Sequence, residues 1–396
     1  MSAQPPRDAR IALIFFFMLA GITMGSWVAR IPDVQHRLDL SDGQLGLALL
    51  GTAVGALVAL PTSGVLVSKF GSVGVLTIAA FGVCAMLPIL PMAPSLITFA
   101  LILLVFGVFY GSFEVPANSQ AVIVEKAYQR PIMSSFHAMF SVGGLIGAAT
   151  SGLIAGRGVA PVPHLAAVGV LMAIGTVIAR PHLMPDPPQP RGNGPLFALP
   201  TGALLGLGII GFCVLLGEGA MADWTAVYLR NNLGTTAAIA AAGYTAFSLM
   251  MAIGRFAGDG LTQRFSAVAM IRTGGLLVAF GLGIGLFVGN VAGAVIGFAA
   301  VGAGLATLFP LVLSAAGRTP GVSPTFALTA VATAGYVGFL AGPPVIGFVA
   351  ERFGLKTGLL VVAALGVVVF AMAGQARHSD GLGEPTVDGA GVVPEG

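Results

Sequence analysis

Apolar stretches long enough to cross a lipid bilayer recur along almost the whole chain. A helix needs about 20 apolar residues to span the hydrocarbon core of a membrane. Such stretches occupy residues 10–30, 45–67, 73–93, 95–122, 131–156, 162–180, 199–224, 236–257, 268–289, 291–316, 324–349 and 355–374. Only 8% of the 396 residues are charged, whereas a soluble chain carries roughly 25%. The sequence therefore predicts an all-α membrane protein with twelve transmembrane helices.

The most hydrophilic internal segment, RPHLMPDPPQPRGNGP at 180–195, separates the sixth stretch from the seventh. We therefore expect an N-terminal six-helix bundle over 1–180, a cytoplasmic linker over 181–197 and a C-terminal six-helix bundle over 198–375. The polar, glycine-rich end of the chain, 376–396, is expected to be a disordered cytoplasmic tail.

The distribution of Lys and Arg predicts the orientation in the membrane. With both termini in the cytoplasm, twelve of the eighteen Lys and Arg residues fall on the cytoplasmic side. Cytoplasmic loops are enriched in positive charge. The net charge of +3 is thus explained by membrane topology, and it indicates lipid, not nucleic acid, as the surroundings of the protein.

The two halves of the chain share a weak internal repeat. When residues 21–38 are placed over 218–233, Trp27 falls on Trp224 and Met24 on Met221. Further along, SGVLVSKFGS at 63–72 matches GDGLTQRFSA at 258–267. Matches in the same order at nearly constant spacing predict two pseudo-symmetric six-helix bundles.

The segment GVLVSKFG at 64–71 resembles the signature of the loop between helices two and three in the major facilitator superfamily. Both copies lack the acidic residue of that signature, which is Ser68 in the first half and Gln263 in the second. Asp259, one helical turn after Arg255, is expected to replace it in part in the second half. The resemblance implies the major facilitator fold, which transports solutes by alternating access.

Four other segments resemble the YbjJ-like branch of this superfamily, a set of bacterial inner-membrane transporters. They are WVARIP (27–32), RPIMSSFHAMFSVGGLIGA (130–148), EGAMADWTAVYLR (218–230) and GYVGFLAGPPVIGF (335–348). The resemblance implies a multi-pass protein of a bacterial inner membrane. Its substrate is not implied by the family.

The segment FEVPANSQ at 113–120 is similar to the fucose–proton symporters through Glu114 and Asn118. In those proteins the acidic residue of the pattern is implicated in proton coupling. Their acidic residue in the first span has no counterpart in GITMGSWVAR at 21–30. Proton coupling is therefore an implication of this resemblance, and sugar specificity is not.

Polar side chains recur at helical spacing on several spans, as expected of helices that line a cavity between two repeats. The candidate cavity residues are Thr23, Trp27, Tyr110, Asn118, Ser141, Glu218, Trp224, Tyr244, Thr333 and Tyr336. For Trp27 and Trp224, anchoring at the membrane interface is an alternative role. For Glu218, the alternative is a hydrogen bond between packed helices.

Glu114 and His137 are the candidate proton-coupling residues. A carboxyl group in an apolar span favours its neutral form, and histidine exchanges protons near neutral pH. Glu114 therefore suits the loading and release of a proton, and His137 suits a relay to it. The alternatives are a permanently protonated Glu114 and a histidine that only forms a structural hydrogen bond.

Acidic and basic residues near the span ends suggest gates. Glu218 and Asp223 are five residues apart, about 140° around a helix, so they do not form a catalytic pair. We expect Asp223 to form a gate or structural ion pair. Its partner is either Arg230, two turns later on the same helix face, or Arg30 at the outer end of the first span. Arg255 and Asp259 form the second expected gate pair.

These features predict a secondary active transporter of a small polar solute, a proton symporter that works as a monomer. A proton-driven efflux antiporter is the alternative, because GGLIGAATSG at 143–152 has the glycines of the antiporter signature although it lacks the proline. The five histidines are scattered, and Cys84 and Cys213 lie in apolar runs. We therefore expect no enzymatic activity, no metal site and no cofactor.

Overall fold

The computed structural model describes residues 6–129, 132–186 and 197–379, apart from the side chains of Asp259, His378 and Ser379. Within these residues, twelve helical segments are long and apolar enough to cross a membrane, and the predicted number is confirmed. The N-terminal half contains α1 (Arg7–Val28), α2 (Ile31–Leu38), α3 (Asp42–Phe70), α4 (Ser72–Met86), α5 (Leu96–Tyr128), α6 (Met133–Gly156) and α7 (Pro161–Ala179). The C-terminal half contains α8 (Leu205–Val227), α9 (Ala237–Ala240), α10 (Ala242–Thr262), α11 (Ala267–Leu276), α12 (Gly283–Val288), α13 (Val291–Leu305), α14 (Leu308–Gly317), α15 (Pro324–Phe353) and α16 (Leu355–Met372).

Short helical turns join or extend these helices. Two of them are π-helical, η4 (Tyr228–Asn232) and η5 (Leu277–Leu282). The others are 3₁₀ turns, η1 (Leu90–Met92), η2 (Arg180–His182), η3 (Gly202–Leu204) and η6 (Ala373–Ser379). As a result, several spans consist of two or three consecutive helical segments.

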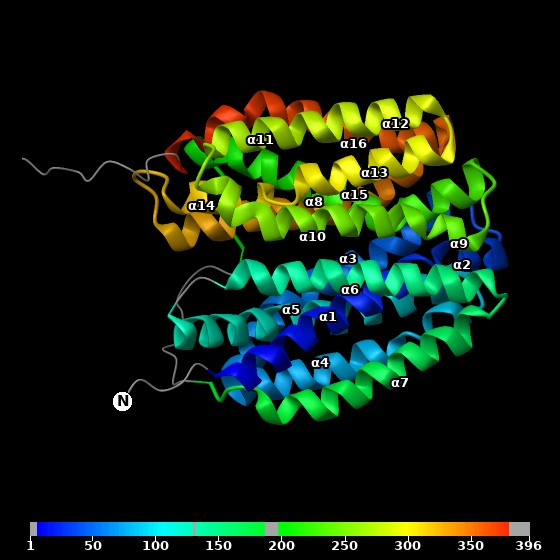
Figure 1. Cartoon of the computed structure of the whole chain (residues 1–396), viewed down its shortest axis with the longest axis horizontal. Coiled ribbons are helices and arrows are strands. Elements are labelled where there is room, and N and C mark those ends of the chain that lie inside the picture. The colour runs from blue at the N-terminus through cyan, green and yellow to red at the C-terminus, as the bar shows by residue number, and fades with distance from the viewer. Residues whose placement is uncertain (1–5, 130–131, 187–196, 380–396) are drawn as a thin grey trace, which may run out of the picture.

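The two halves pair their helices in the same way. In the N-terminal half, the first span packs against the fifth (α1 on α6) and the second against the fourth (α3 on α5). In the C-terminal half, α8 packs against α15 and α10 against α13, which are again the first and fifth and the second and fourth spans. Figure 1 shows the two bundles side by side. The predicted pair of pseudo-symmetric six-helix bundles is confirmed.

Glycines allow the closest of these helix contacts. A Cβ atom added at Gly21 or Gly25 of α1 would overlap the backbone of α6, at Phe140 and Gly144. In return, a Cβ atom at Gly147 of α6 would overlap the backbone of α1. Small residues let membrane helices approach to backbone contact. Gly143 and Gly147 therefore hold α6 against α1 within one half.

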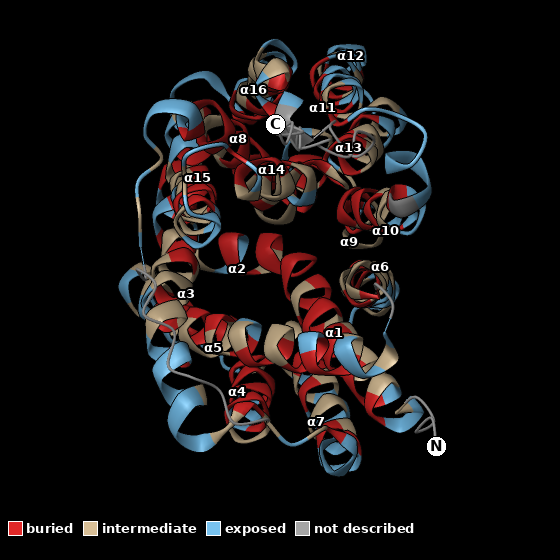
Figure 2. Ribbon diagram, turned by 90° about the vertical axis from the view of Figure 1, so that its left-hand side faces the viewer, coloured by how far each residue is buried: buried red, intermediate tan, exposed pale blue. Residues whose placement is uncertain are grey.

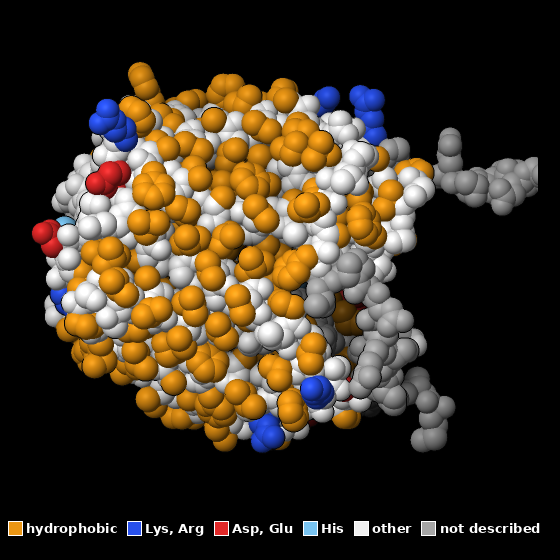
Figure 3. All heavy atoms as spheres, turned by 180° about the vertical axis from the view of Figure 1, so that it is seen from behind, with side chains coloured by type: hydrophobic (Ala, Val, Ile, Leu, Met, Phe, Trp, Pro, Cys, Tyr) orange, Lys and Arg blue, Asp and Glu red, His pale blue; other side chains and the backbone are white. Residues whose placement is uncertain are grey.

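The surface suits a lipid environment. Large apolar side chains are exposed on the helix faces that point away from the bundles, including Phe287 at 83%, Ile97 at 73% and Ile296 at 68%. Figure 3 shows an apolar face with the visible charged side chains towards its two ends. Figure 2 shows that the buried residues lie where the helices of each half meet.

Helix α1 begins, and α16 ends, on the same side of the molecule, at the left in Figure 1. We call this the termini side and the opposite one the distal side. On the distal side, α3 and α15 are in backbone contact, because a Cβ atom at Gly46 would lie 2.5 Å from the carbonyl oxygen of Pro343. A Cβ atom added at Gly152 of α6 would lie 3.0 Å from the carbonyl oxygen of Ala238 in α9 and 2.6 Å from the Cβ atom of Ala241, directly after α9. The halves are therefore closed against each other on the distal side.

The linker contributes a contact that the sequence did not reveal. The Asp186 carboxylate accepts a hydrogen bond from the Ser72 N–H, 2.7 Å away, at the start of α4. The buried side chain of Gln120 in α5 donates to the Ser72 hydroxyl and to the Met184 carbonyl, both at 2.7 Å. Asp186 thus places an acidic group at the junction of α3 and α4, shortly after Ser68, which stands in the last turn of α3 in place of the acid of the family signature.

Parts of the expected linker and tail lie outside the described residues, namely 187–196 and 380–396. The described start of the expected tail, 376–379, continues η6, and Ala376 is fully buried. The helical structure of the described residues therefore extends slightly beyond the expected end of the second bundle at residue 375.

Candidate functional site

Glu114 and Tyr336 join the two halves near the middle of the membrane spans. Glu114 lies in the middle of α5, and Tyr336 lies in the middle of α15. The Tyr336 hydroxyl donates a hydrogen bond to the Glu114 Oε1 atom, 2.9 Å away. A carboxyl group of the N-terminal half is therefore in direct contact with the C-terminal half.

The surroundings of this pair are accessible to solvent. Glu114 is exposed, and Tyr110, Asn118 and Tyr336 are partly exposed, although all four lie well inside their spans. An exposed carboxyl group that bridges two halves must lie in an open space between them. Figure 3 shows the surface hollowed at the end of the molecule where the described chain ends lie. The central space therefore opens to the termini side.

Arg255 forms a second contact between the halves. Its Nη2 atom donates to the Glu218 carboxylate at 2.8 Å, and this ion pair joins α10 to α8 within the C-terminal half. Its Nη1 atom donates to the Ser141 hydroxyl at 2.8 Å and to the His137 carbonyl at 3.4 Å, both in α6. One guanidinium group thus links Glu218 to the opposite half.

Two tyrosines lie beside these charged groups. The Tyr110 hydroxyl donates to the Ala20 carbonyl at 3.3 Å, and Tyr110 interacts electrostatically with Glu114 and Glu218. Tyr244 hydrogen-bonds to Ser248 and interacts electrostatically with Glu218 and Arg255. The structure therefore gathers these residues, which the sequence placed on five different spans, into one cluster.

Other candidate residues form local contacts. The Asn118 amide donates to the Glu114 carbonyl of its own helix, and the Thr333 hydroxyl donates to the Thr329 carbonyl. The His137 ring packs edge-on against Phe17, with 5.3 Å between the ring centres. The link from His137 to the cluster runs through its carbonyl group to Arg255, and a proton relay from its ring to Glu114 stays a prediction.

Thr23, Trp27 and Trp224 do not line the cavity in this conformation. Their exposed fractions are 0%, 2% and 0%. The Thr23 hydroxyl donates to carbonyl groups of its own helix, and Trp27 packs edge-on against Phe99. Closure of the distal side places both tryptophans in the protein core. They offer no surface to a solute or to the membrane interface.

The expected ion pair between Arg30 and Asp223 is wrong for this conformation. Arg30 forms its ion pair with Asp33, 3.0 Å away, because α2 begins directly after it and places that carboxylate one turn further on. Its other nitrogens donate to His164 Nδ1 and to the Val159 carbonyl. Asp223 is partly exposed, forms no ion pair with a described residue and interacts electrostatically with Tyr244.

In the second expected gate pair, Arg255 with Asp259, the described ion pair of Arg255 is formed with Glu218 instead. The side chain of its expected partner, Asp259, lies outside the described residues.

The contacts that close the distal side were missed in the sequence. The Glu351 carboxylate at the end of α15 accepts a hydrogen bond from the Gly43 N–H in the first turn of α3, 2.9 Å away. Asn231 of the C-terminal half hydrogen-bonds to both Gln35 and His36 of α2, each at 2.9 Å. These residues lie between the apolar stretches that predict the spans, and among them only the helix-start motif SDGQ at 41–44 is a sequence signal.

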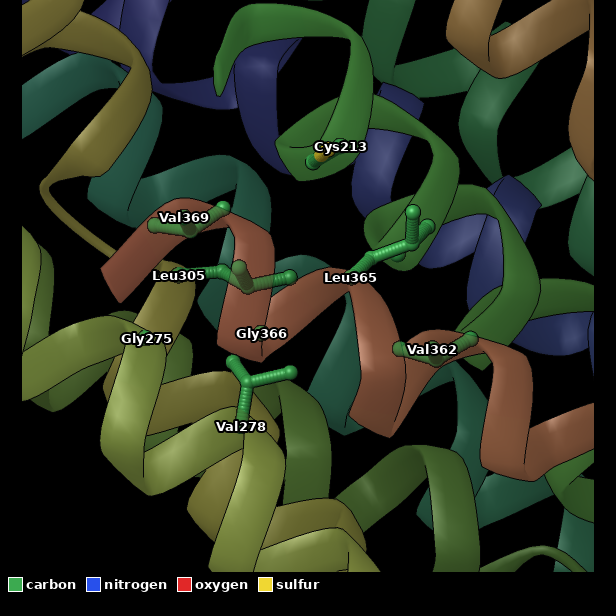
Figure 4. Close-up of a pocket in the computed structure, with 9 residues that line it drawn as sticks. Cys213, Gly275, Val278, Leu305, Val362, Leu365, Gly366 and Val369 are labelled. Atoms are coloured by element: carbon green, nitrogen blue, oxygen red, sulfur yellow. The ribbon is translucent and has the colours of Figure 1, made fainter. Parts of the chain in front are cut away.

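Neither a metal site nor a second ligand site is indicated by two further observations on the described residues. Groups of His, Cys, Asp and Glu that suit a metal ion are absent from that part of the chain. Figure 4 shows a gap in the C-terminal half beside Cys213, Leu305 and Val362. Its lining is apolar and it leaves no room for a water molecule, so it is a packing feature.

Comparisons with known proteins agree with this architecture. A profile of the Major Facilitator Superfamily matches residues 11–211. An uncharacterised MFS-type transporter of Yersinia pestis is 36% identical over 372 residues, which cover 94% of this chain and 97% of the relative. The protein is therefore a multi-pass transporter of the Major Facilitator Superfamily, and it belongs to a family of small-molecule transporters and not to a family of enzymes.

Solved structures show the same fold at low sequence identity. A bacterial homologue of the human lysosomal transporter Spinster, in an inward-facing and occupied conformation, superimposes with a TM-score of 0.75 at 15% identity, over 95% of this chain and 98% of that one. The Escherichia coli fucose:proton symporter superimposes with a TM-score of 0.62 at 17% identity, over 92% and 98% of the two chains. These similarities confirm the major facilitator fold.

Proposed function

We propose that the protein is a proton-coupled symporter that carries a small polar solute across a bacterial inner membrane by alternating access. The observation that carries this proposal is the hydrogen bond between Glu114 and Tyr336, which joins the two halves inside a solvent-accessible space. Both termini lie in the cytoplasm, and the structure represents the inward-facing conformation. One chain contains the whole site and works as a monomer.

Proton coupling follows from the cost of moving a charged carboxyl group through an occluded membrane site. When the cavity is open, water and the Tyr336 hydroxyl stabilise the Glu114 carboxylate. During the change of access the water is lost, and a charge at the membrane centre becomes costly. A protonated Glu114 avoids this cost. The transporter therefore changes its access with solute bound and Glu114 protonated, and the solute crosses together with a proton. Each proton brings roughly 2.3 kcal/mol per 100 mV of membrane potential.

The other polar groups of the cluster suit a small polar solute. Arg255 is already held by Glu218 and Ser141, and this fixes the direction of its remaining N–H donors. Asn118 and Tyr110 lie on the same face of α5 as Glu114, one turn away on either side. Donors and acceptors fixed around an aqueous cavity orient a polar solute better than an apolar one.

Several comparisons support the proposal. The Escherichia coli protein with the same fold is named as a fucose:proton symporter, and the Spinster homologue is described as inward-facing. The Yersinia pestis relative is a bacterial protein. The excess of Lys and Arg on the termini side supports cytoplasmic termini.

The test separates binding from coupling. Solutes are first screened by their effect on the thermal unfolding of the purified protein, and hits are tested for uptake into proteoliposomes with and without a pH gradient. Glu114→Gln keeps a hydrogen-bond acceptor for Tyr336 and cannot be titrated. We expect this variant to exchange solute across the membrane but to lose accumulation driven by the pH gradient.

Glu125→Gln is the matched control, because Glu125 lies on the same helix and accepts hydrogen bonds from the Ile132 and Met133 N–H groups at the start of α6. It should accumulate solute like the wild type. Undiminished gradient-driven accumulation in Glu114→Gln would show that Glu114 has no coupling role. Export of solute in exchange for protons in the wild type would replace symport with antiport.

A further inference from the structure

A second cavity lies on the distal side, separate from the central cluster. Its volume is about 550 Å³, and its lining includes Arg30, His36 and Arg37 of the region around α2, and Val159 after α6. Arg230 and Ala237 line it from the C-terminal half. The cavity therefore lies where the two halves meet on the side away from the chain termini.

The cavity carries an excess of positive charge. Three arginines line it, but Asp33 is its single acidic lining residue among the described ones, and Asp33 is paired with Arg30. Arg37 donates to the Ala93 carbonyl and Arg230 to the Thr235 carbonyl, each at 2.7 Å. These carbonyl partners are neutral, so the charges of Arg37 and Arg230 are not balanced by a described carboxylate.

The guanidinium groups also keep donors available. Each has five N–H donors in a planar fork that matches the oxygens of a phosphate or carboxylate group. In Arg37 and Arg230 a single nitrogen has a described hydrogen-bond partner, a carbonyl oxygen. His36 also lines the cavity, and its Nε2 atom forms a hydrogen bond with the Asn231 side chain, 2.9 Å away. Small-molecule sites have volumes of about 300–1,000 Å³, so the cavity has the right size.

We propose that this distal cavity binds a small anion through a phosphate or carboxylate group held between Arg37 and Arg230. The anion is either a soluble molecule on the distal side or the headgroup of an anionic lipid, since both present the same oxygens. It is distinct from the solute of the central cavity, which lies deeper in the membrane and opens to the opposite side.

Binding at this place also affects the conformation. Arg37 belongs to the N-terminal half and Arg230 to the C-terminal half, so an anion between them is contacted by both halves only while the distal side is closed. A ligand shifts a conformational equilibrium towards the state that it binds more tightly. The anion therefore stabilises the distal-closed conformation, and this consequence rests on the proposed alternating access.

The experiment measures binding directly, in nanodiscs of neutral phosphatidylcholine. The two tryptophans serve as reporters, because Trp27 lies one turn before Arg30 and Trp224 lies six residues before Arg230. Inorganic phosphate and succinate are titrated against sodium chloride of equal ionic strength. We expect a saturable fluorescence change in the wild type, with an affinity at least about tenfold weaker in Arg37→Gln and in Arg230→Gln.

Arg352→Gln is the matched control, because Arg352 is an exposed arginine on the distal side that does not line the cavity. It should bind like the wild type. A second arm uses nanodiscs that contain phosphatidylglycerol and counts retained lipid by native mass spectrometry. Retention that is lost in Arg37→Gln and Arg230→Gln, but not in Arg352→Gln, identifies a lipid headgroup as the anion.

The proposal is overturned if neither soluble anions nor phosphatidylglycerol bind in a way that depends on Arg37 or Arg230. Both arms measure binding without transport. Their outcome is therefore independent of the test of proton coupling at Glu114.

Discussion

Gly46→Ala is predicted to open the distal side of the transporter. Gly46 lies in α3 of the N-terminal half, and its partner is the backbone of α15 in the C-terminal half. An added Cβ atom would lie 2.5 Å from the Pro343 carbonyl oxygen and 3.1 Å from the Gly347 Cα atom. Both are backbone atoms and cannot rotate away as a side chain would.

The size of the effect follows from these distances. Ordinary contacts of a Cβ atom begin at 3.4 Å, so α3 and α15 must separate by about 0.9 Å, the difference between 3.4 and 2.5 Å. An extra methyl group forced into a packed interface costs about 1–3 kcal/mol. This cost applies to the distal-closed conformation and not to one in which the helices have parted. The equilibrium should therefore shift towards distal opening by about 5- to 150-fold.

The assay is a distance measurement across the distal side. Spin labels are attached at Met92→Cys and Lys356→Cys, both exposed, in a background without Cys84 and Cys213. Pulsed electron paramagnetic resonance should show a larger population of long distances in Gly46→Ala than in the parent protein.

Gly64→Ala is the control for Gly46→Ala. Gly64 lies in the same helix, and a Cβ atom there would meet nothing within 4 Å. It shares the gain in helix propensity of about 1 kcal/mol without the clash. If Gly46→Ala and Gly64→Ala give the same distance distribution, the contact between α3 and α15 does not control distal closure.

Three further substitutions test the central cluster and the termini side. Tyr336→Phe removes the hydroxyl that contacts Glu114, so gradient-driven accumulation should fall while solute exchange persists, and unchanged accumulation would speak against the role of this bond. Glu218→Gln leaves Arg255 without its carboxylate and should lower the free energy of unfolding by about 1–3 kcal/mol, a cost that solvent screening of this partly exposed ion pair reduces. The loss of thermal stability should be much smaller when Arg255→Gln is already present. Gln120→Leu leaves the buried Ser72 hydroxyl and Met184 carbonyl without their partner, at a cost of about 1–3 kcal/mol, and an unaltered unfolding temperature would contradict this account of the network.

The fold could be predicted from the sequence because the bilayer restricts so strongly the backbone structures that can cross it. A run such as 10–30 must be a helix if it crosses a membrane, since its backbone groups cannot bond to water there. Twelve such runs and a weak repeat then predict two six-helix bundles. The helix ends were less accessible, because caps and turns, such as those that extend the fourth span to Tyr128, continue into polar sequence.

The candidate site was accessible in part. Helical spacing placed Glu114, Tyr336 and Arg255 on faces that meet, because polar residues on one stripe of a membrane helix must face protein or water. Their partners were not predictable. The contact of Arg255 with Glu218, and not with a residue of its own helix, depends on how α8 and α10 pack.

The errors at Trp27, Trp224 and Arg30 have a common physical origin. Sequence position shows how deep a residue lies in the membrane, but not whether the two halves are open or closed above it. In the distal-closed conformation both tryptophans are buried, and α2 supplies Asp33 to Arg30 at close range. A conformation with an open distal side would expose different faces of the same helices.

Proton movement that accompanies solute entry is the most direct test of the account. Proteoliposomes with a pH-sensitive dye inside receive, on the outside, a solute found by the binding screen, with the membrane potential clamped at zero. The account predicts that addition of solute acidifies the interior in the wild type and in Glu125→Gln, but not in Glu114→Gln. Solute entry without acidification in the wild type, or equal acidification in Glu114→Gln, would contradict proton symport through Glu114.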